Sequence, residues 1–393
     1  MKTNSTLMMA SVLTLSAGAV GNAHAQSSVN IYGIVDVAAV YSSNQGGKSN
    51  TYERSGNLAG SRLGFRGTED LGDGVSALFV LENGFNVDDG SMGAANTLFN
   101  RQSYVGLSSN TYGSLTAGRQ YTPYYLFVGP VGPTSALTGA TGAHPGDIDG
   151  LDTTIRINNS LTYTSPVMSG AQVSAQYGMG EVAGSTSTGN AFSAALKYDI
   201  NDFRFAVAYL KMRNGANVGA GWSPGAAGSF PTSVINKGYL SAESVQYIAG
   251  GARYKLGALE LGLNGSNVKY APKPGSLFAN TAVFNTGGVL ATYQVTPAVF
   301  VSGGYSYTRE KAANGISDPA KYQQLALEQT YALSKRTSLY LLEAYQYAKG
   351  KTLGAAGIGN QVNAVAAVGD SQNGSPSNAR NQTVLMAGIR HSF

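Results

Sequence analysis

Several arginines in this chain alternate with apolar residues, and the alternation predicts where they point. The segment 62–66 reads Arg-Leu-Gly-Phe-Arg, and Arg156 lies between two isoleucines. Successive side chains of a β-strand point to opposite faces, so Arg62, Arg66 and Arg156 fall on the face opposite their apolar neighbours. Fixed cations along one face of a sheet attract and orient ions without breaking any bond.

Acidic residues provide the opposite charge. Glu82 falls on the face opposite Phe79 and Leu81, and residues 147–152 read Asp-Ile-Asp-Gly-Leu-Asp. A unit charge ~4 Å from a fixed charge feels about 1 kcal/mol even in bulk water. Arginines and carboxylates on opposite sides of a water-filled passage would therefore sort solutes by charge.

The sequence does not favour catalysis or metal binding. After residue 25 the histidines are His144, in a Gly/Pro-rich stretch, and His391, near the end of the chain. Neither lies beside a plausible nucleophile in the sequence. The aspartates of 147–152 depart from the EF-hand spacing. We expect neither an enzyme nor a cofactor or metal site.

The composition is unusual for a water-soluble domain. Charged residues make up 12% of the chain against a typical ~25%, with 52 Gly, 24 Tyr and no Cys. A lipid-facing β-barrel needs such an apolar, aromatic-rich surface. A large soluble β-propeller or lectin fits the composition as well. The net charge of +5 does not indicate nucleic-acid binding, because the basic residues are scattered rather than clustered.

The amino-terminal end reads as a secretory signal peptide. Lys2 precedes a mostly apolar run at 7–20, and Ala-His-Ala follows at 23–25. The run is too short and too polar for a membrane-spanning helix, and no later segment approaches 18 consecutive apolar residues. We expect cleavage before Gln26, which leaves one domain over 26–393.

Short amphipathic segments recur through that domain, and links of alternating length join them. The sixteen segments are 29–42, 52–68, 74–86, 99–109, 112–121, 156–165, 171–180, 190–200, 202–213, 245–256, 258–271, 284–294, 298–309, 321–332, 337–349 and 381–393. Counted from the first segment, the link from each even-numbered segment to the next one is short. The link from each odd-numbered segment to the next one is longer. This asymmetry predicts an all-β, sixteen-stranded antiparallel transmembrane β-barrel.

The last segment ends the chain on Phe393, with Leu385 and Ile389 on one face and Arg390 on the other. Hydrocarbon cannot hydrogen-bond a backbone, so a spanning sheet has no free edge. The segment ending at Phe393 is therefore expected to pair with the first one and close the barrel.

Several longer motifs, taken together and in order, give the chain a resemblance to a known family. They are 29–33 (VNIYG), 60–72 (GSRLGFRGTEDLG), 81–85 (LENGF), 99–107 (FNRQSYVGL), 118–121 (GRQY), 156–163 (RINNSLTY), 331–337 (YALSKRT) and 388–393 (GIRHSF). With these motifs the chain resembles the general porins of Gram-negative bacteria, in the branch common among β-proteobacteria. The resemblance implies a homotrimer in the outer membrane whose third long loop, here 122–155, folds inward to narrow a pore.

The resemblance also assigns site residues. Arg62, Arg101 and Arg156 match the arginine ladder of the family's pore constriction, and Glu82 matches a wall carboxylate near that ladder. Asp147 and Asp149 fall where the family places the acidic side, and the sequence does not choose between them. Arg66 and Arg119 are expected either to line the pore or to form ion pairs in its wall.

These features together predict a water-filled channel for passive diffusion of small hydrophilic solutes and ions, with a mild anion preference. Its expected surroundings are outer-membrane lipid and lipopolysaccharide, with no nucleic-acid partner. Two alternatives stay open. One is a substrate-specific channel for sugars or organic anions, with an aromatic slide made by Tyr121, Tyr124, Tyr125 and Phe127. The other is a barrel plugged by its loops.

Overall fold

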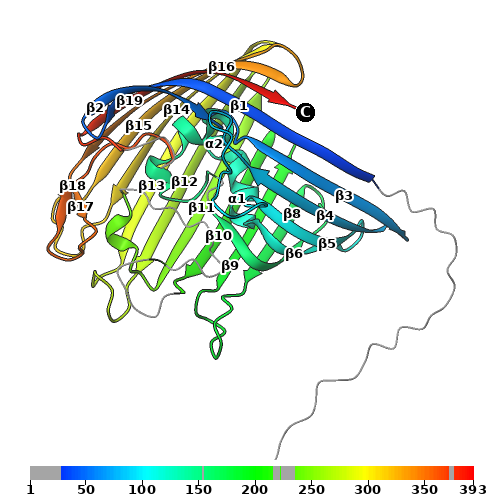
Figure 1. Cartoon of the computed structure of the whole chain (residues 1–393), viewed down its shortest axis with the longest axis horizontal. Coiled ribbons are helices and arrows are strands. Elements are labelled where there is room, and N and C mark those ends of the chain that lie inside the picture. The colour runs from blue at the N-terminus through cyan, green and yellow to red at the C-terminus, as the bar shows by residue number, and fades with distance from the viewer. Residues whose placement is uncertain (1–27, 153–154, 216–221, 223–234, 371–375) are drawn as a thin grey trace, which may run out of the picture.

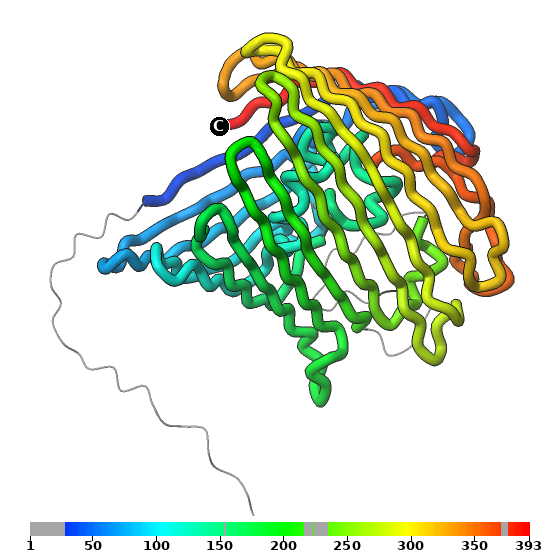
Figure 2. Tube along the Cα trace, turned by 180° about the vertical axis from the view of Figure 1, so that it is seen from behind, coloured from blue at the N-terminus to red at the C-terminus, as the bar shows by residue number. Residues whose placement is uncertain are grey.

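The computed structural model describes residues 28–152, 155–215, 222, 235–370 and 376–393. Strands dominate, and they stand side by side in chain order as a tilted, curved wall (Figures 1 and 2). The expected signal peptide, 1–25, lies outside the described residues. No helix within the described part of the chain is long and apolar enough to cross a membrane.

Nineteen strands occur in the described part of the chain. They are β1 (Ser28–Gln45), β2 (Lys48–Ser55), β3 (Arg62–Gly72), β4 (Val75–Gly84), β5 (Gln102–Ser109), β6 (Gly113–Tyr121), β7 (Arg156–Thr164), β8 (Ala171–Gly178), β9 (Ala191–Ile200), β10 (Phe203–Arg213), β11 (Ser244–Leu256), β12 (Leu259–Ala271), β13 (Ala282–Thr296), β14 (Val299–Glu310), β15 (Lys321–Ala332), β16 (Thr337–Lys349), β17 (Lys351–Leu353), β18 (Gln361–Asn363) and β19 (Asn381–Ser392).

Among the described residues, one antiparallel sheet holds all of these strands except β17 and β18, which form a separate hairpin. Strands β2 and β3 pair with successive parts of β1, so together they fill one position in the wall. The barrel therefore has sixteen positions, and the predicted fold class is confirmed.

The first and last strands close the barrel. Strand β19 pairs with β1 from Ile34↔Ser392 to Ser42↔Val384. Beyond the ladder, Gly33 and Phe393 exchange two backbone hydrogen bonds of 3.0 Å each. A side chain at Gly33 would collide with the Phe393 ring. Figure 1 shows the carboxyl terminus beside β1. The sheet thus has no free edge, as a hydrocarbon surrounding requires.

The strands present apolar residues to the outside. Leu385 and Ile389 of β19 are both 43% exposed, whereas Val384 is 1% exposed. Leu263 and Val289, which face each other across β12 and β13, are 62% and 60% exposed. This alternation gives the wall an apolar outer face, which is the surface that lipid contacts in a transmembrane barrel.

The 122–155 segment joins β6 to β7 and contains short helices where the sequence suggested only a long Pro/Gly-rich loop. They are α1 (Pro123–Val128), η1 (Gly129–Val131), α2 (Thr134–Leu137), η2 (Thr138–Gly142) and η3 (Pro145–Asp147). The Thr122 hydroxyl caps α1 by accepting from the Tyr125 N–H at 3.1 Å, and Pro123 occupies the first turn. Tyr124, Phe127 and Val128 form the buried face of this helix.

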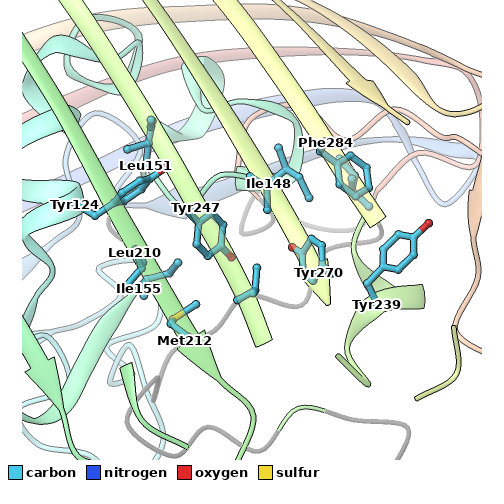
Figure 3. Close-up of a cluster of buried hydrophobic side chains, with 14 of the residues drawn as sticks. Tyr124, Ile148, Leu151, Ile155, Leu210, Met212, Tyr239, Tyr247, Tyr270 and Phe284 are labelled. Carbon is cyan, nitrogen blue, oxygen red and sulfur yellow. The ribbon is translucent and has the colours of Figure 1, made fainter. Parts of the chain in front are cut away.

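Two apolar clusters hold the segment against the wall. In the first, Tyr124, Ile148, Leu151 and Ile155 pack on residues of β10 to β13, among them Tyr247 and Phe284 (Figure 3). In the second, Ala136, Leu137 and Ala140 pack on residues of β1, β13, β15, β16 and β19. The same segment therefore contacts distant parts of the wall, although its ends belong to β6 and β7. Inward folding of this loop stays a prediction to which these contacts lend support.

Most predicted strand bounds agree with the observed ones to within about three residues. The largest difference is the break between β2 and β3. There Asp36 accepts hydrogen bonds from the backbone N–H groups of Asn57, Leu58 and Ala59 at 3.2, 2.9 and 2.7 Å. Asp36 thereby satisfies the amides that leave the ladder, and the wall opens into a short loop at 56–61.

Candidate functional site

A cavity of about 970 Å³ lies where the 56–61 loop, the β4–β5 link, β6, β7 and the 122–155 segment meet. Positively charged side chains outnumber negatively charged ones in its lining. Among the described residues, five arginines and two aspartates line it. The arginines are Arg54, Arg62, Arg101, Arg119 and Arg156, and the aspartates are Asp152 and Asp370. The structure thus brings together all three predicted ladder arginines and one of the two additional candidates.

Arg101 is the most firmly held of the three predicted ladder arginines. Its Nε donates to Glu82 Oε1 at 2.8 Å, and an Nη donates to the Tyr121 hydroxyl at 2.7 Å. Glu82 also accepts from the Tyr32 hydroxyl at 3.0 Å, and Arg62 lies 4.0 Å from the same carboxylate. Charge-assisted hydrogen bonds of this kind fix a guanidinium in one orientation.

Tyr121 joins Arg101 to Arg156. The Arg156 guanidinium lies 4.9 Å from the centre of the Tyr121 ring, and its Nη donates to the Tyr121 hydroxyl at 3.4 Å. A cation over an aromatic face is attracted by the ring quadrupole. One aromatic side chain therefore helps to position two arginines that would otherwise repel each other.

The remaining candidate arginines differ in where they lie. Arg119 lines the cavity and donates to the Asn100 carbonyl at 2.8 Å and to Asn158. Arg66 does not line it; its guanidinium lies 5.4 Å from the centre of the Tyr32 ring. Of the two, only Arg119 contributes charge to the cavity.

Glu82 is 3% exposed and does not line the cavity; it lies behind the arginines as their counter-ion. Its inward orientation follows from the strand alternation.

Asp147 and Asp149 are not brought to the cavity. The Ser266 hydroxyl donates to Asp149 Oδ2 at 2.6 Å, and His144 Nδ1 lies 2.5 Å from the same oxygen. Burial by itself raises the pKa of Asp149, but His144 and the Ser266 hydrogen bond outweigh it and hold that pKa below its usual value. Asp147 accepts from the Asp152 backbone N–H at 3.1 Å. Both carboxylates fix the 122–155 segment itself.

The two aspartates that do line the cavity were missed. Asp152 belongs to the acidic run 147–152, so the sequence contained its signal but not the orientation of its side chain. Asp370 lies in the Gly/Asn-rich link before β19, where no local pattern marks it. Burial and the neighbouring Asp370 carboxylate raise the pKa of Asp152 well above its usual value.

The arrangement can hold and sort ions, because fixed guanidinium groups face a smaller number of carboxyl groups. No group of three or more His, Cys, Asp or Glu side chains suited to a metal ion occurs in the described part of the chain.

Known proteins place this geometry in a family context. Residues 10–353 match the family model described as Gram-negative porin. An outer membrane porin protein of Bordetella pertussis is 30% identical and covers 86% of this chain and 93% of its own length. Outer membrane porin protein 32 of Delftia acidovorans is 30% identical, with coverage of 95% and 96%. An anion-selective porin from Comamonas acidovorans superposes with a TM-score of 0.70 at 26% identity, covering 94% of this chain and all of that one.

Proposed function

The chain belongs to the Gram-negative porin family, and from this premise we propose that its arginine-lined cavity is the narrow part of a diffusion channel that prefers anions. As a family member the protein is a passive channel of the outer membrane and not an enzyme.

The excess of arginines in the cavity lining supports the anion preference. Within the described part of the chain, five arginines and two aspartates line the cavity, and Glu82 behind them offsets part of the positive charge. The Debye length of ~8 Å at physiological salt is comparable to a pore radius, so salt screens these charges only in part. Anions are therefore enriched near the arginines, and cations are depleted. The similar porin from Comamonas acidovorans is described as anion-selective, which agrees with this proposal.

The site roles follow from the same geometry. Arg62, Arg101 and Arg156 form the positive side of the filter, Arg119 extends it, and Glu82 holds Arg101 in place. Asp147 and Asp149 stabilise the 122–155 segment, which we expect to occupy part of the barrel interior and reduce the open cross-section. Its contacts with distant strands support that placement.

The proposal also covers how the protein is exported and assembled. We expect a homotrimer, exported with the signal peptide at 1–25 and embedded in outer-membrane lipid and lipopolysaccharide, because the family resemblance implies these features.

The alternative of a sugar-specific channel receives little support. Tyr121, Tyr124 and Phe127 are buried, and Tyr125 alone of the four proposed slide residues lines the cavity. A single ring does not make an aromatic slide. Small hydrophilic solutes, anions above all, are the better substrate class.

The proposal is tested in a planar bilayer under a KCl gradient with the purified protein. We expect stepwise conductance in multiples of three and a reversal potential on the anion side. A reversal potential on the cation side would contradict the anion preference. Absence of conductance from a folded, heat-modifiable β-rich protein would contradict the open channel.

A further inference from the structure

The stretch 364–370, which precedes β19, packs on the 122–155 segment. The Asp370 N–H donates to the Gly139 carbonyl at 3.0 Å, and the Gly146 N–H donates to the Gly369 carbonyl at 2.8 Å. The link before the last strand and the link between β6 and β7 are therefore joined through their backbones, although more than two hundred residues separate them.

The barrel wall holds the same stretch from the other side. The Ala367 N–H donates to the side-chain oxygen of Gln346 at 2.8 Å, and Gln346 donates back to the Ala367 carbonyl at 2.8 Å. The Val368 N–H donates to Gln382 Oε1 at 2.9 Å. Both glutamines are buried, so these bonds form away from competing water.

Two glycines permit the close approach that brings the carboxyl groups together. Gly369 has a φ of +65°, and a Cβ there would collide with the Ala140 carbonyl. A Cβ on Gly139 would collide with the Asp152 carboxyl group. Only glycine fits both positions without rearrangement, and the result is that Asp152 and Asp370 reach the cavity side by side.

Asp370 contacts charged groups of both signs. Its Oδ1 lies 3.8 Å from an Nη of Arg54, and burial together with the nearby Asp370 carboxyl group raises the pKa of Asp152. Both aspartates line the cavity that the arginines line.

We infer that Asp370 and Asp152 together form the acidic side of the filter, and that this pair limits how strongly the channel prefers anions over small cations such as K⁺. The inference rests on the proposed channel function. It names as selectivity determinants two residues from different links, in place of the Asp147 and Asp149 that the family resemblance suggested.

The pair carries less charge than two separate carboxylates. Burial and the Asp370 charge disfavour ionisation of Asp152, so the pair holds one negative charge while Asp152 stays protonated. Replacement of one member by Asn leaves the other free to ionise. Only the double replacement removes the negative charge entirely.

The test is the Cl⁻/K⁺ permeability ratio of the full-length Asp152→Asn/Asp370→Asn protein, from reversal potentials under a KCl gradient. Loss of one negative charge ~4 Å from the ion path is expected to change the local concentration of each ion roughly fivefold, upward for Cl⁻ and downward for K⁺. The ratio should therefore rise by more than about fivefold over wild type. Each single variant is expected to change it by less. An unchanged ratio in a double variant of wild-type conductance overturns the inference.

Asp318→Asn is the matched control. Asp318 is 69% exposed, pairs with Lys321 at 3.0 Å and does not line the cavity. This variant removes one negative charge, as the double variant does, and its ratio should equal that of wild type. A wild-type protein without conductance would instead sink the channel proposal, so the two failures are distinguishable.

If the double variant fails to assemble, the wild-type protein decides the question by its pH dependence. The groups that face Asp152 are Asp370, Asp147, Tyr125 and Arg54. As pH rises through the raised pKa of Asp152, the pair gains a second negative charge, so the Cl⁻/K⁺ ratio should fall. Asp152→Asn should remove this fall. A wild-type ratio that does not change with pH overturns the inference.

Discussion

Asp149 and Asp152 lie three residues apart in one segment, and their surroundings give them different tasks. The Asp149 carboxylate is enclosed between His144 and Ser266, where it ties the segment to β12. The Asp152 carboxyl group lines the cavity beside Asp370. The two side chains have the same chemistry, so burial and partners decide whether a carboxylate stabilises the segment or acts on passing ions.

Removal of the stabilising carboxylate should have the largest effect. Asp149→Ala leaves His144 and Ser266 buried without their shared acceptor, which costs about 3 kcal/mol. We expect a lower urea midpoint in detergent micelles and noisier single-channel currents, while the reversal potential keeps its sign because the arginines stay in place. Asp152→Ala is the comparison variant and should leave the midpoint nearly unchanged. Equal losses of stability in the two variants would break the distinction between the two aspartates.

Reversal of an arginine across the cavity should give the next largest effect. Arg156→Glu changes the local charge by two units, each worth about 1 kcal/mol at ~4 Å. The reversal potential under a KCl gradient should therefore move toward cations by more than any Asp→Asn variant moves it the other way. Arg336→Glu, at the exposed β15–β16 turn, is the control for net charge. An unchanged reversal potential in Arg156→Glu would remove this residue from the filter.

The pH dependence of stability should reflect the buried pair of His144 and Asp149. Burial by itself lowers the pKa of His144, but the Asp149 carboxylate outweighs it and raises that pKa, while the pKa of Asp149 is lowered. The contribution of His144 is complete below its unfolded pKa of about 6.5 and is lost as pH rises through the folded value. The contribution of Asp149 is present above about pH 3.9 and is lost as pH falls through its lowered value.

The segment should therefore be most stable between about pH 4 and pH 6.5. A tenfold difference in proton affinity between the folded and unfolded states corresponds to about 1.4 kcal/mol of stability. Urea midpoints measured at mildly acid and mildly alkaline pH check this expectation. His144→Gln should flatten the alkaline loss. Identical pH profiles for this variant and wild type would show that the His144–Asp149 pair does not set the stability of the segment.

Strand geometry explains which parts of the site the sequence could predict. Arg62 and Arg156 begin β3 and β7, where a period of two fixes the side-chain direction, and both line the cavity. Arg101 precedes β5 and lies outside any strand, so no alternation placed it, and only the family resemblance did.

The acidic side could not be predicted in the same way. Asp147 has a φ of +50° and Gly150 one of +67°, so the backbone takes the left-handed conformation twice within the acidic run and its side chains follow no regular period. The contact of Asp149 with Ser266 of β12 and the contact of Gly139 with Asp370 decide which carboxylate turns to the cavity. Such contacts join residues more than a hundred positions apart, and a single sequence carries no local record of them.

The smallest expected effect belongs to Tyr121, whose hydroxyl contacts Arg101 at 2.7 Å and Arg156 at 3.4 Å. Tyr121→Phe keeps the ring and its attraction for the guanidinium groups but removes the shared acceptor, a change of about 1 kcal/mol in how firmly the arginines are held. The fixed charge is unchanged, so the Cl⁻/K⁺ ratio should shift by less than about twofold, well below the effect of Arg156→Glu. Tyr163→Phe, an exposed tyrosine of β7, is the control. A shift in Tyr121→Phe as large as that in Arg156→Glu would mean that arginine position, rather than the count of charges on each side, governs selectivity.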